Sequence, residues 1–354
     1  MICPHCQKNL LRKERPNNTC SHCRRTYALD PKTNSLGLSD LRVRRIVDKV
    51  TEGGRIAVTP DQLWYALSRR HLKKGMFAPG CAGTSLLTGL IVGVFGIFTG
   101  NLYLALVSGA LLLVSAGFAL ARAAGAGRGF PVMSRAEFRS EVLAPWRQVY
   151  GGLPPRVVDD TPPVPSQART RAPSGAAPGA VLLCPDGSIT AFLNAAGLPA
   201  RYGIALAKDL DAVHALPMRG PVIVLHDADA QGELLVRRVR ASPGQRAVID
   251  AGLPLRTVRR LAQAVPYRDK QEKPDRETMA LLTELGEFTE AELKWLGKGW
   301  RFPLIGMPPA RLLAAVTRVA EQVTRSVDPE RRRAASVGFM TWPGSGAQGH
   351  AGER

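Results

Sequence analysis

Four cysteines near the start of the chain are the clearest group of side chains with a defined chemistry. They form two CxxC pairs, Cys3 with Cys6 and Cys20 with Cys23, and thirteen residues separate the pairs. Two residues between cysteines allow a tight turn, so both thiolates of a pair can reach one ion. The spacing predicts a structural, tetrahedral zinc site.

Disulfide bonding is the alternative use of these thiols, and it requires an oxidising compartment. The chain opens with Met-Ile-Cys-Pro-His-Cys, without an apolar segment of the signal-peptide type ahead of the cysteines, so zinc is preferred. His5 and His22 are competing ligands, but four cysteines already fill the tetrahedron. Because a closed site has no open position for water or substrate, we predict a structural role for it.

The same residues resemble the zinc-ribbon family over about thirty residues. The resemblance implies two knuckles that support a small antiparallel sheet, and we place this module at residues 1–35. Zinc ribbons bind nucleic acids and proteins alike. We favour a protein partner and keep nucleic acid open.

Aspartates at the ends of apolar runs form the second group of candidate site residues. Between residues 179 and 261, apolar runs alternate with helical patterns, which predicts an α/β domain with a mostly parallel sheet. Ligands of such sheets bind at the carboxyl ends of the strands. The aspartates at these ends are Asp186, Asp227, Asp229 and Asp250.

Two segments of this region, VLLCPDGSITAFLNAAGL and VIVLHDADAQGELLVRRV, resemble the Toprim domain of primases and topoisomerases. In that family an acidic residue after the first strand and a DxD pair hold Mg²⁺ for phosphoryl transfer. The resemblance implies that Asp186 is the general acid or base and that Asp227 and Asp229 bind Mg²⁺. Carboxylates suit this ion because it prefers oxygen ligands.

The sequence departs from the Toprim pattern at its first acidic position. The family has Glu where this chain has Asp186, which is one methylene shorter and follows a proline, and Thr190 stands where an acidic residue is common. An acidic residue at a strand end also often caps the next helix. We favour a Toprim-like or Rossmann-like fold without retained catalysis and keep catalysis as the alternative.

The stretch from Ala78 to Ala121 contains no charged residue and divides at Thr99-Gly100-Asn101. Each half is about 20 residues long, which matches the hydrocarbon thickness of a bilayer. A buried pair of helices in a soluble protein is the alternative, but neither half has a polar face. We therefore predict a two-helix transmembrane hairpin over residues 78–122.

Cations flank this stretch on both sides, whereas its central loop is uncharged. They are Arg69, Arg70, Lys73 and Lys74 before it and Arg122, Arg128, Arg135 and Arg139 after it. By the positive-inside rule, both termini are cytoplasmic and the turn near Asn101 faces outward. We expect a multi-pass protein of the bacterial inner membrane.

Small residues recur in both halves of the hairpin. They are Gly89, Gly93, Gly96 and Gly100 in the first half and Ser108, Gly109, Ala116 and Gly117 in the second. Small residues let helices approach closely. Packing of the hairpin on itself and oligomerisation through these helices both remain open.

The remaining segments complete a multidomain chain of 354 residues. Helical spacing predicts a helix from Leu38 to Val50 with Ser39 as N-cap, and Thr59-Pro60-Asp61 opens another. The Pro-rich stretch and the Gly-rich tail are expected to be unstructured. The predicted parts beside the ribbon and the hairpin are a basic juxtamembrane helical module at 36–77, a basic juxtamembrane helix at 123–150, a flexible linker at 151–178, the α/β domain with a helical extension at 179–330 and a disordered tail at 331–354.

Aromatic and basic residues alternate in the helical extension of the α/β domain. Its members are Trp295, Trp300 and Phe302 with Lys294, Lys298 and Arg301. They form either a basic-aromatic binding surface or, more commonly for aromatics near a helix end, part of a core.

We expect a membrane-anchored binding or scaffold protein that recruits a protein or nucleic-acid partner on the cytoplasmic side. The net charge of +19 is weak evidence for nucleic acid, because arginine is the chain's usual polar residue. The alternative is a Mg²⁺-dependent phosphoryl-transfer enzyme or nuclease that acts through Asp186, Asp227 and Asp229.

Overall fold

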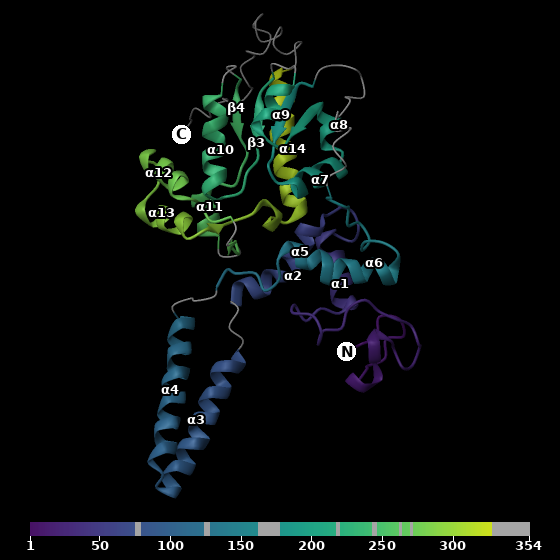
Figure 1. The fold of residues 1–354 in the computed structure, drawn as a ribbon. Helices are drawn as coiled ribbons and strands as arrows, with labels where there is room; N and C mark the ends of the chain where they lie inside the picture. The colour runs from purple at the N-terminus through teal and green to yellow at the C-terminus, as the bar shows by residue number, and fades with distance from the viewer. Residues whose placement is uncertain are drawn as a thin grey trace, which may run out of the picture.

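The computed structural model describes residues 1–74, 79–123, 128–161, 178–216, 220–242, 246–261, 264–269 and 272–327. The predicted tail at 331–354 lies outside the described residues. An α/β body forms the largest part of the molecule (Figure 1). A cysteine-containing N-terminal module and a pair of long helices project from the same end of this body (Figure 1).

The N-terminal module consists of two short hairpins and two 3₁₀ turns. Antiparallel bridges join Ile2 to Asn9 in the first hairpin and Thr19 to Thr26 in the second. The 3₁₀ turns, Arg12–Glu14 and Pro16–Asn18, connect the hairpins. Leu10 packs with the cysteines in a small core of its own.

A four-stranded parallel sheet is the centre of the body. Its strands are β1 (Ala180–Leu183), β2 (Ile204–Ala207), β3 (Val222–Val224) and β4 (Val248–Asp250), in the order β2-β1-β3-β4. In the register, Leu183 stands beside Ala207 on one side and Val224 on the other. This confirms the predicted α/β domain with a parallel sheet.

Successive residues of β1 point to opposite faces of the sheet, as the strand period of two requires. Val181 and Leu183 pack with residues of α9 and α10, whereas Ala180 and Leu182 share the main core with α7 and α14. The helices of this region are α7 (Gly187–Ala195), α8 (Leu198–Tyr202), α9 (Leu210–Ala215), α10 (Ala230–Ala241), α11 (Leu255–Arg260), α12 (Arg276–Glu284), α13 (Glu290–Gly297) and α14 (Pro309–Val327). A small antiparallel pair is formed by β5 (Tyr267–Arg268) and β6 (Trp300–Arg301).

Four helices from the segments before and after the long helix pair share one hydrophobic core with the α/β region. They are α1 (Asp40–Val50), α2 (Pro60–Lys74), α5 (Arg135–Phe138) and α6 (Ala144–Tyr150). The predicted starts of α1 after Ser39 and of α2 at Pro60 are confirmed. A π-helical turn, Arg139–Leu143, joins α5 to α6.

Hydrogen bonds tie α2 to segments far away in the sequence. The Trp64 indole donates to the Met133 carbonyl at 2.9 Å, and the Tyr65 hydroxyl donates to the Val265 carbonyl at 2.6 Å. Val58 forms a bridge with Val157, which is buried. The first part of the predicted linker, residues 151–161, therefore contains a position that is packed in the fold. The rest of that linker, residues 162–177, lies outside the described residues. The segments around α2 and α5 therefore belong to one hydrophobic core with the sheet.

The long helices α3 (Pro79–Thr99) and α4 (Leu102–Ala123) are antiparallel and joined by a tight turn at Gly100, whose φ is +60°. The Ser108 hydroxyl donates to the Gly89 carbonyl at 2.7 Å. A Cβ at Gly93 would lie 2.6 Å from the Ser108 hydroxyl oxygen, whereas Cβ atoms at Gly109 and Gly117 would meet nothing within 4 Å. Gly89 and Gly93 of α3 thus lie at the contact between the two helices.

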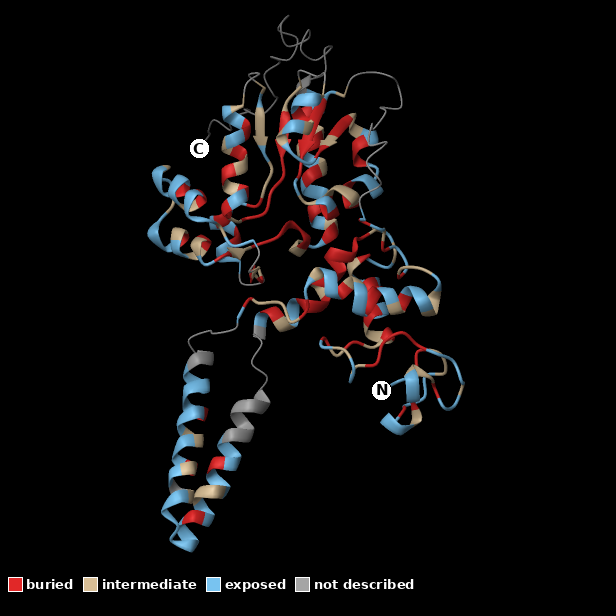
Figure 2. Ribbon diagram, viewed as in Figure 1, coloured by how far each residue is buried: buried red, intermediate tan, exposed pale blue. Residues whose placement is uncertain are grey.

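Most large apolar side chains of this helix pair are exposed (Figure 2). Leu102–Leu120 of α4 is long and apolar enough to cross a membrane, with a mean hydropathy of 2.1 and only 12% of the segment buried. The apolar stretch Leu86–Thr99 of α3 is shorter. A helix that is apolar all round and exposed requires an apolar environment.

Candidate metal centre and acidic cleft

The four predicted cysteine ligands meet at one point of the N-terminal module. Their sulfur atoms all lie within 4.8 Å of one another. The Sγ atoms of Cys3 and Cys23 are 3.8 Å apart, as are those of Cys6 and Cys20. Zn–S bonds of about 2.3 Å in a tetrahedron place sulfurs about 3.8 Å apart. The site therefore has the geometry to hold one metal ion of zinc's size.

Both CxxC turns have the same backbone conformation. The Cys3 amide donates to the Lys8 carbonyl at 2.9 Å, and the Cys20 amide donates to the Arg25 carbonyl at 3.1 Å. The residue after each second cysteine has a positive φ, 59° at Gln7 and 56° at Arg24. This repetition shows how two local turns aim four sulfurs inward.

The histidines are not part of the sulfur cluster. The His5 Nε2 atom makes a 2.9 Å hydrogen bond to the Thr26 carbonyl, and the His22 side chain is exposed. Backbone amides of Cys23 and His22 lower the pKa of Cys20 to about 7, whereas burial raises the pKa of Cys3 to about 11. A bound cation would favour the thiolate form of all four.

The second candidate site is a cleft of about 630 Å³ at the carboxyl ends of β1 and β3. Asp186 follows β1, and Asp227 and Asp229 follow β3. Since β1 and β3 are neighbours, all three aspartates line this cleft. Asp250 ends β4 and lines a different pocket beside His226, so the structure does not bring it to the other three.

Two of the three aspartates cap helices. Asp186 is the N-cap of α7 and accepts hydrogen bonds from the amides of Ser188 and Ile189 at 2.8 and 3.2 Å. Asp229 is the N-cap of α10 and accepts from the Gly232 amide at 2.7 Å. These bonds satisfy backbone donors that a helix start leaves open.

Arg301 of β6 lies between the two carboxylates of the DxD motif. Its guanidinium is 3.0 Å from Asp227 and 2.7 Å from Asp229, and it also pairs with Glu272. The Leu304 amide donates to the other oxygen of Asp227 at 2.8 Å. Within the described part of the chain, the cysteines are the one group of three or more ligand side chains that converge as a metal site would require.

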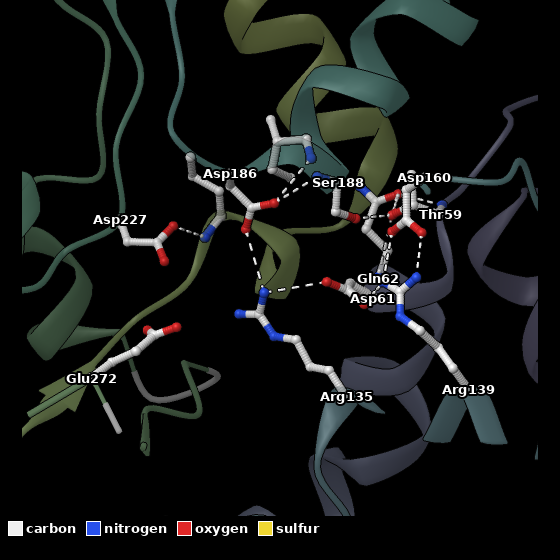
Figure 3. Close-up of polar contacts among 12 residues, drawn as sticks. Thr59, Asp61, Gln62, Arg135, Arg139, Asp160, Asp186, Ser188, Asp227 and Glu272 are labelled. Carbon is white, nitrogen blue, oxygen red and sulfur yellow. Dashed lines mark hydrogen bonds and ion pairs between the residues drawn. The ribbon is translucent and has the colours of Figure 1, made fainter. Parts of the chain in front are cut away.

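A second ion-pair network forms the other wall of the cleft (Figure 3). Arg139 contacts Asp61 at 2.5 Å and Asp160 at 2.7 Å, and Arg135 contacts Asp61 at 3.2 Å and Asp186 at 3.8 Å. The Thr59 hydroxyl is 2.5 Å from that of Ser188 on α7. Both arginines come from the segment that follows α4, whereas Asp61 comes from the segment that precedes α3. Segments before and after the helix pair in the sequence therefore both line the cleft.

Burial raises the pKa values of three carboxylates in the cleft. It raises the pKa of Asp186, with Asp227 adding repulsion, and it raises the pKa of Asp227 against the attraction of Arg301. Burial also raises the pKa of Asp61 despite Arg135 and Arg139. The arginines therefore compensate carboxylates that would otherwise be costly to bury.

The buried side chain of His226 lies beside the half-exposed carboxylate of Asp250. Its Nε2 atom is 3.2 Å from the Asp250 carboxylate, and its Nδ1 atom is 2.7 Å from the Asp227 carbonyl. Both partners are acceptors, an arrangement that favours the doubly protonated imidazolium. Burial alone would lower the pKa of His226, but these hydrogen bonds raise it.

Comparisons of the sequence with models of protein families, with curated proteins and with solved structures give no match.

Arg301 and Arg135 were not predicted from the sequence to bind the aspartates. In the sequence Arg301 lies among tryptophans, and Arg135 is one of the cations that follow the apolar stretch. Both contacts join residues more than 50 positions apart, and the sequence signal was only that buried carboxylates require cationic partners.

Proposed function

We propose that this chain is a membrane-anchored binding protein whose N-terminal zinc module and α/β body recruit a partner on the cytoplasmic side of the bacterial inner membrane. The observation that carries the proposal is the exposed apolar surface of α4, because exposure of such a surface to water is unfavourable. The membrane anchor keeps the protein at the membrane, and the N-terminal zinc module and the α/β body supply the binding surfaces.

In this proposal α3 crosses the membrane together with α4. The turn between them is too short to hold a domain, and its residues are uncharged, whereas cations stand at the other end of both helices. The positive-inside rule then places both termini in the cytoplasm. On that side thiols stay reduced, which is the state that a zinc site needs.

The geometry of the cysteines supports Zn²⁺ as the bound ion, because four thiolates in a tetrahedron are its usual structural site. The module would then work as a zinc ribbon that presents its exposed residues to a protein, or alternatively to a nucleic acid. Because four cysteines would leave no open coordination position for water or substrate, we propose no reaction at this site.

The α/β body supports binding over catalysis because its acidic residues are already occupied. Asp186 and Asp229 cap helices, and Arg301 takes the position between Asp227 and Asp229 that a cation would need. A guanidinium held by two carboxylates offsets part of their negative charge without a metal. The body would thus be a Toprim-like fold with a structural acidic cleft.

A Mg²⁺-dependent phosphoryl-transfer enzyme is the second candidate. It is favoured by one observation, that Asp186, Asp227 and Asp229 line a single cleft at the ends of adjacent parallel strands. For this reaction Arg301 would have to leave the DxD carboxylates so that Mg²⁺ could take its place.

Crosslinking in living cells tests the binding function. The full-length chain and its Cys20→Ser variant are crosslinked, and the captured proteins and nucleic acids are compared. We expect at least one partner to be lost with Cys20→Ser and retained with His22→Ala, which changes an exposed residue of the same turn that is not a ligand. An identical partner set for all three chains would contradict recruitment by the zinc module.

A further inference from the structure

The α/β body carries a second surface, whose chemistry differs from that of the cleft. Its residues, which we name the basic-aromatic face, are Arg128, Arg268, Lys294, Trp295, Lys298 and Trp300. Lys294 and Lys298 are exposed and stand one helical turn apart, and both tryptophans are partly exposed. The two indoles stack at 6.2 Å, with an angle of 13° between their planes.

Gly129, which follows α4 in the sequence, contacts this face. Gly129 lies against the Trp300 ring so closely that a Cβ there would collide with it, and its φ is +83°. Its carbonyl accepts a hydrogen bond from the Arg268 amide at 2.7 Å. Trp300 and Arg268 are therefore attached to the segment that emerges from the long helices.

Covalent geometry limits how far this face can lie from the end of α4. Only six residue steps separate Ala123, the last residue of α4, from Gly129. At no more than about 3.6 Å per residue, this distance cannot exceed about 22 Å. If α4 crosses a bilayer, the face is within reach of the lipid headgroups.

Cations outnumber acids on the basic-aromatic face. The segments 128–130, 264–269 and 294–302 contain Arg128, Arg268, Lys294 and Lys298 against the acid Asp269, while Arg301 binds the carboxylates of the cleft. The Arg268 guanidinium stacks on Trp300 at 4.3 Å and on Phe130 at 5.5 Å. Such a cation next to indoles is suited to an anion at a membrane interface.

We infer that the basic-aromatic face binds the anionic headgroups of the bilayer that holds α4, and so docks the α/β body on the membrane surface. This inference rests on the proposed membrane anchor. Tryptophans favour the interface because one part of the ring is apolar and the other donates a hydrogen bond. Each Lys or Arg near an anionic surface adds about a fivefold gain in binding.

Hydrogen exchange of the full-length chain in nanodiscs tests the inference. One set of nanodiscs contains only phosphatidylcholine, and the other has about one phosphatidylglycerol in three lipids. We expect amides of residues 293–301 to exchange about tenfold more slowly in the anionic nanodiscs. The difference should vanish for Lys294→Glu/Lys298→Glu and should shrink when salt is raised to about 0.5 M.

Arg201→Glu/Arg240→Glu is the matched control, because it makes the same charge change at exposed positions of α8 and α10. It should retain the slower exchange. Equal exchange in both nanodiscs for a chain that is integrated would overturn this inference alone, and slowing by added single-stranded RNA instead of by anionic lipid would replace it with a nucleic-acid surface. A chain that does not integrate into nanodiscs would overturn the anchor and this inference together.

Discussion

At the scale of single residues, the cysteines and the aspartates differ in what the sequence reveals about them. Each CxxC turn is a local structure of a few residues, so the convergence of the four cysteines could be predicted from the sequence. They are Cys3, Cys6, Cys20 and Cys23. The adjacency of Asp186 and the DxD pair also followed from the order of parallel strands. Their ion pairs with Arg135 and Arg301 did not, because no local pattern connects residues so distant in sequence.

The zinc site gives the first prediction. We expect the purified chain to contain about one zinc ion and Cys20→Ser to contain almost none, because three thiolates bind the ion far more weakly than four. The measurement is metal analysis by mass spectrometry, with His22→Ala as a control that should keep its zinc. A metal-free wild-type chain purified without chelator would contradict the site.

Arg301 gives the second prediction. Arg301→Gln should destabilise the chain by about 3 kcal/mol, because it leaves the buried Asp227 without its cation. Millimolar Mg²⁺ should not change the melting temperature of the wild type but should partly restore that of Arg301→Gln. Thermal unfolding in detergent measures both.

The opposite pattern would favour the enzyme. If Mg²⁺ stabilises the wild-type chain and Asp227→Asn removes the effect, then the carboxylates bind metal in spite of Arg301. A Lys298→Gln control changes an exposed cation close in the sequence and should behave like the wild type.

His226 gives a prediction about pH. Its pKa is raised in the folded chain, so its contribution to stability is complete below about pH 6.5 and is lost as the pH rises through the folded-state pKa. The pKa of Asp250 is lowered, so its contribution is present above about pH 4 and is lost only in acid. Stability should therefore fall as the pH rises above about 6.5.

Asp250→Asn should flatten this fall, because it removes the partner that raises the pKa of His226. Melting temperatures between about pH 5 and pH 9 measure the effect, and Asp211→Asn, at an exposed position of α9, is the control. An unchanged pH profile for Asp250→Asn would show that the pKa of His226 does not depend on this pair.

At the scale of elements, helix starts and apolar runs were predictable because their causes are local. Ser39 and Pro60 mark the starts of α1 and α2, and the turn at Gly100 divides the apolar stretch. The packing of α2 against residues 133 and 265 could not be predicted, since amphipathic spacing shows that a face is buried but not what covers it.

The contact between α3 and α4 gives an element-scale prediction. Gly93→Val should separate the helices and lower the stability of the helix pair, because a Cβ at this position meets the Ser108 hydroxyl. Gly109→Val should be tolerated, because a Cβ there meets nothing within 4 Å. The measurement is the rate of crosslinking between cysteines placed at Leu90 and Leu112 in detergent. Equal rates for both variants would contradict the contact.

At the scale of the whole molecule, the segments before and after the long helices come together into one body. Residues of α2 and α5 share a core with the parallel sheet, and Arg135 of α5 contacts both Asp61 of α2 and Asp186 after β1. Both ends of the helix pair therefore enter the same folded unit, so they must lie on the same side of any membrane that the pair crosses.

The most direct test of this account is the labelling of single introduced cysteines by a membrane-impermeant maleimide in intact cells, with the wild-type chain as background. Asn101→Cys, in the turn between α3 and α4, should be labelled from outside. Arg128→Cys, at an exposed position after α4, should be labelled only once the membrane is permeabilised. Labelling of Arg128→Cys in intact cells, or no labelling of Asn101→Cys, would contradict a membrane anchor with its folded parts in the cytoplasm.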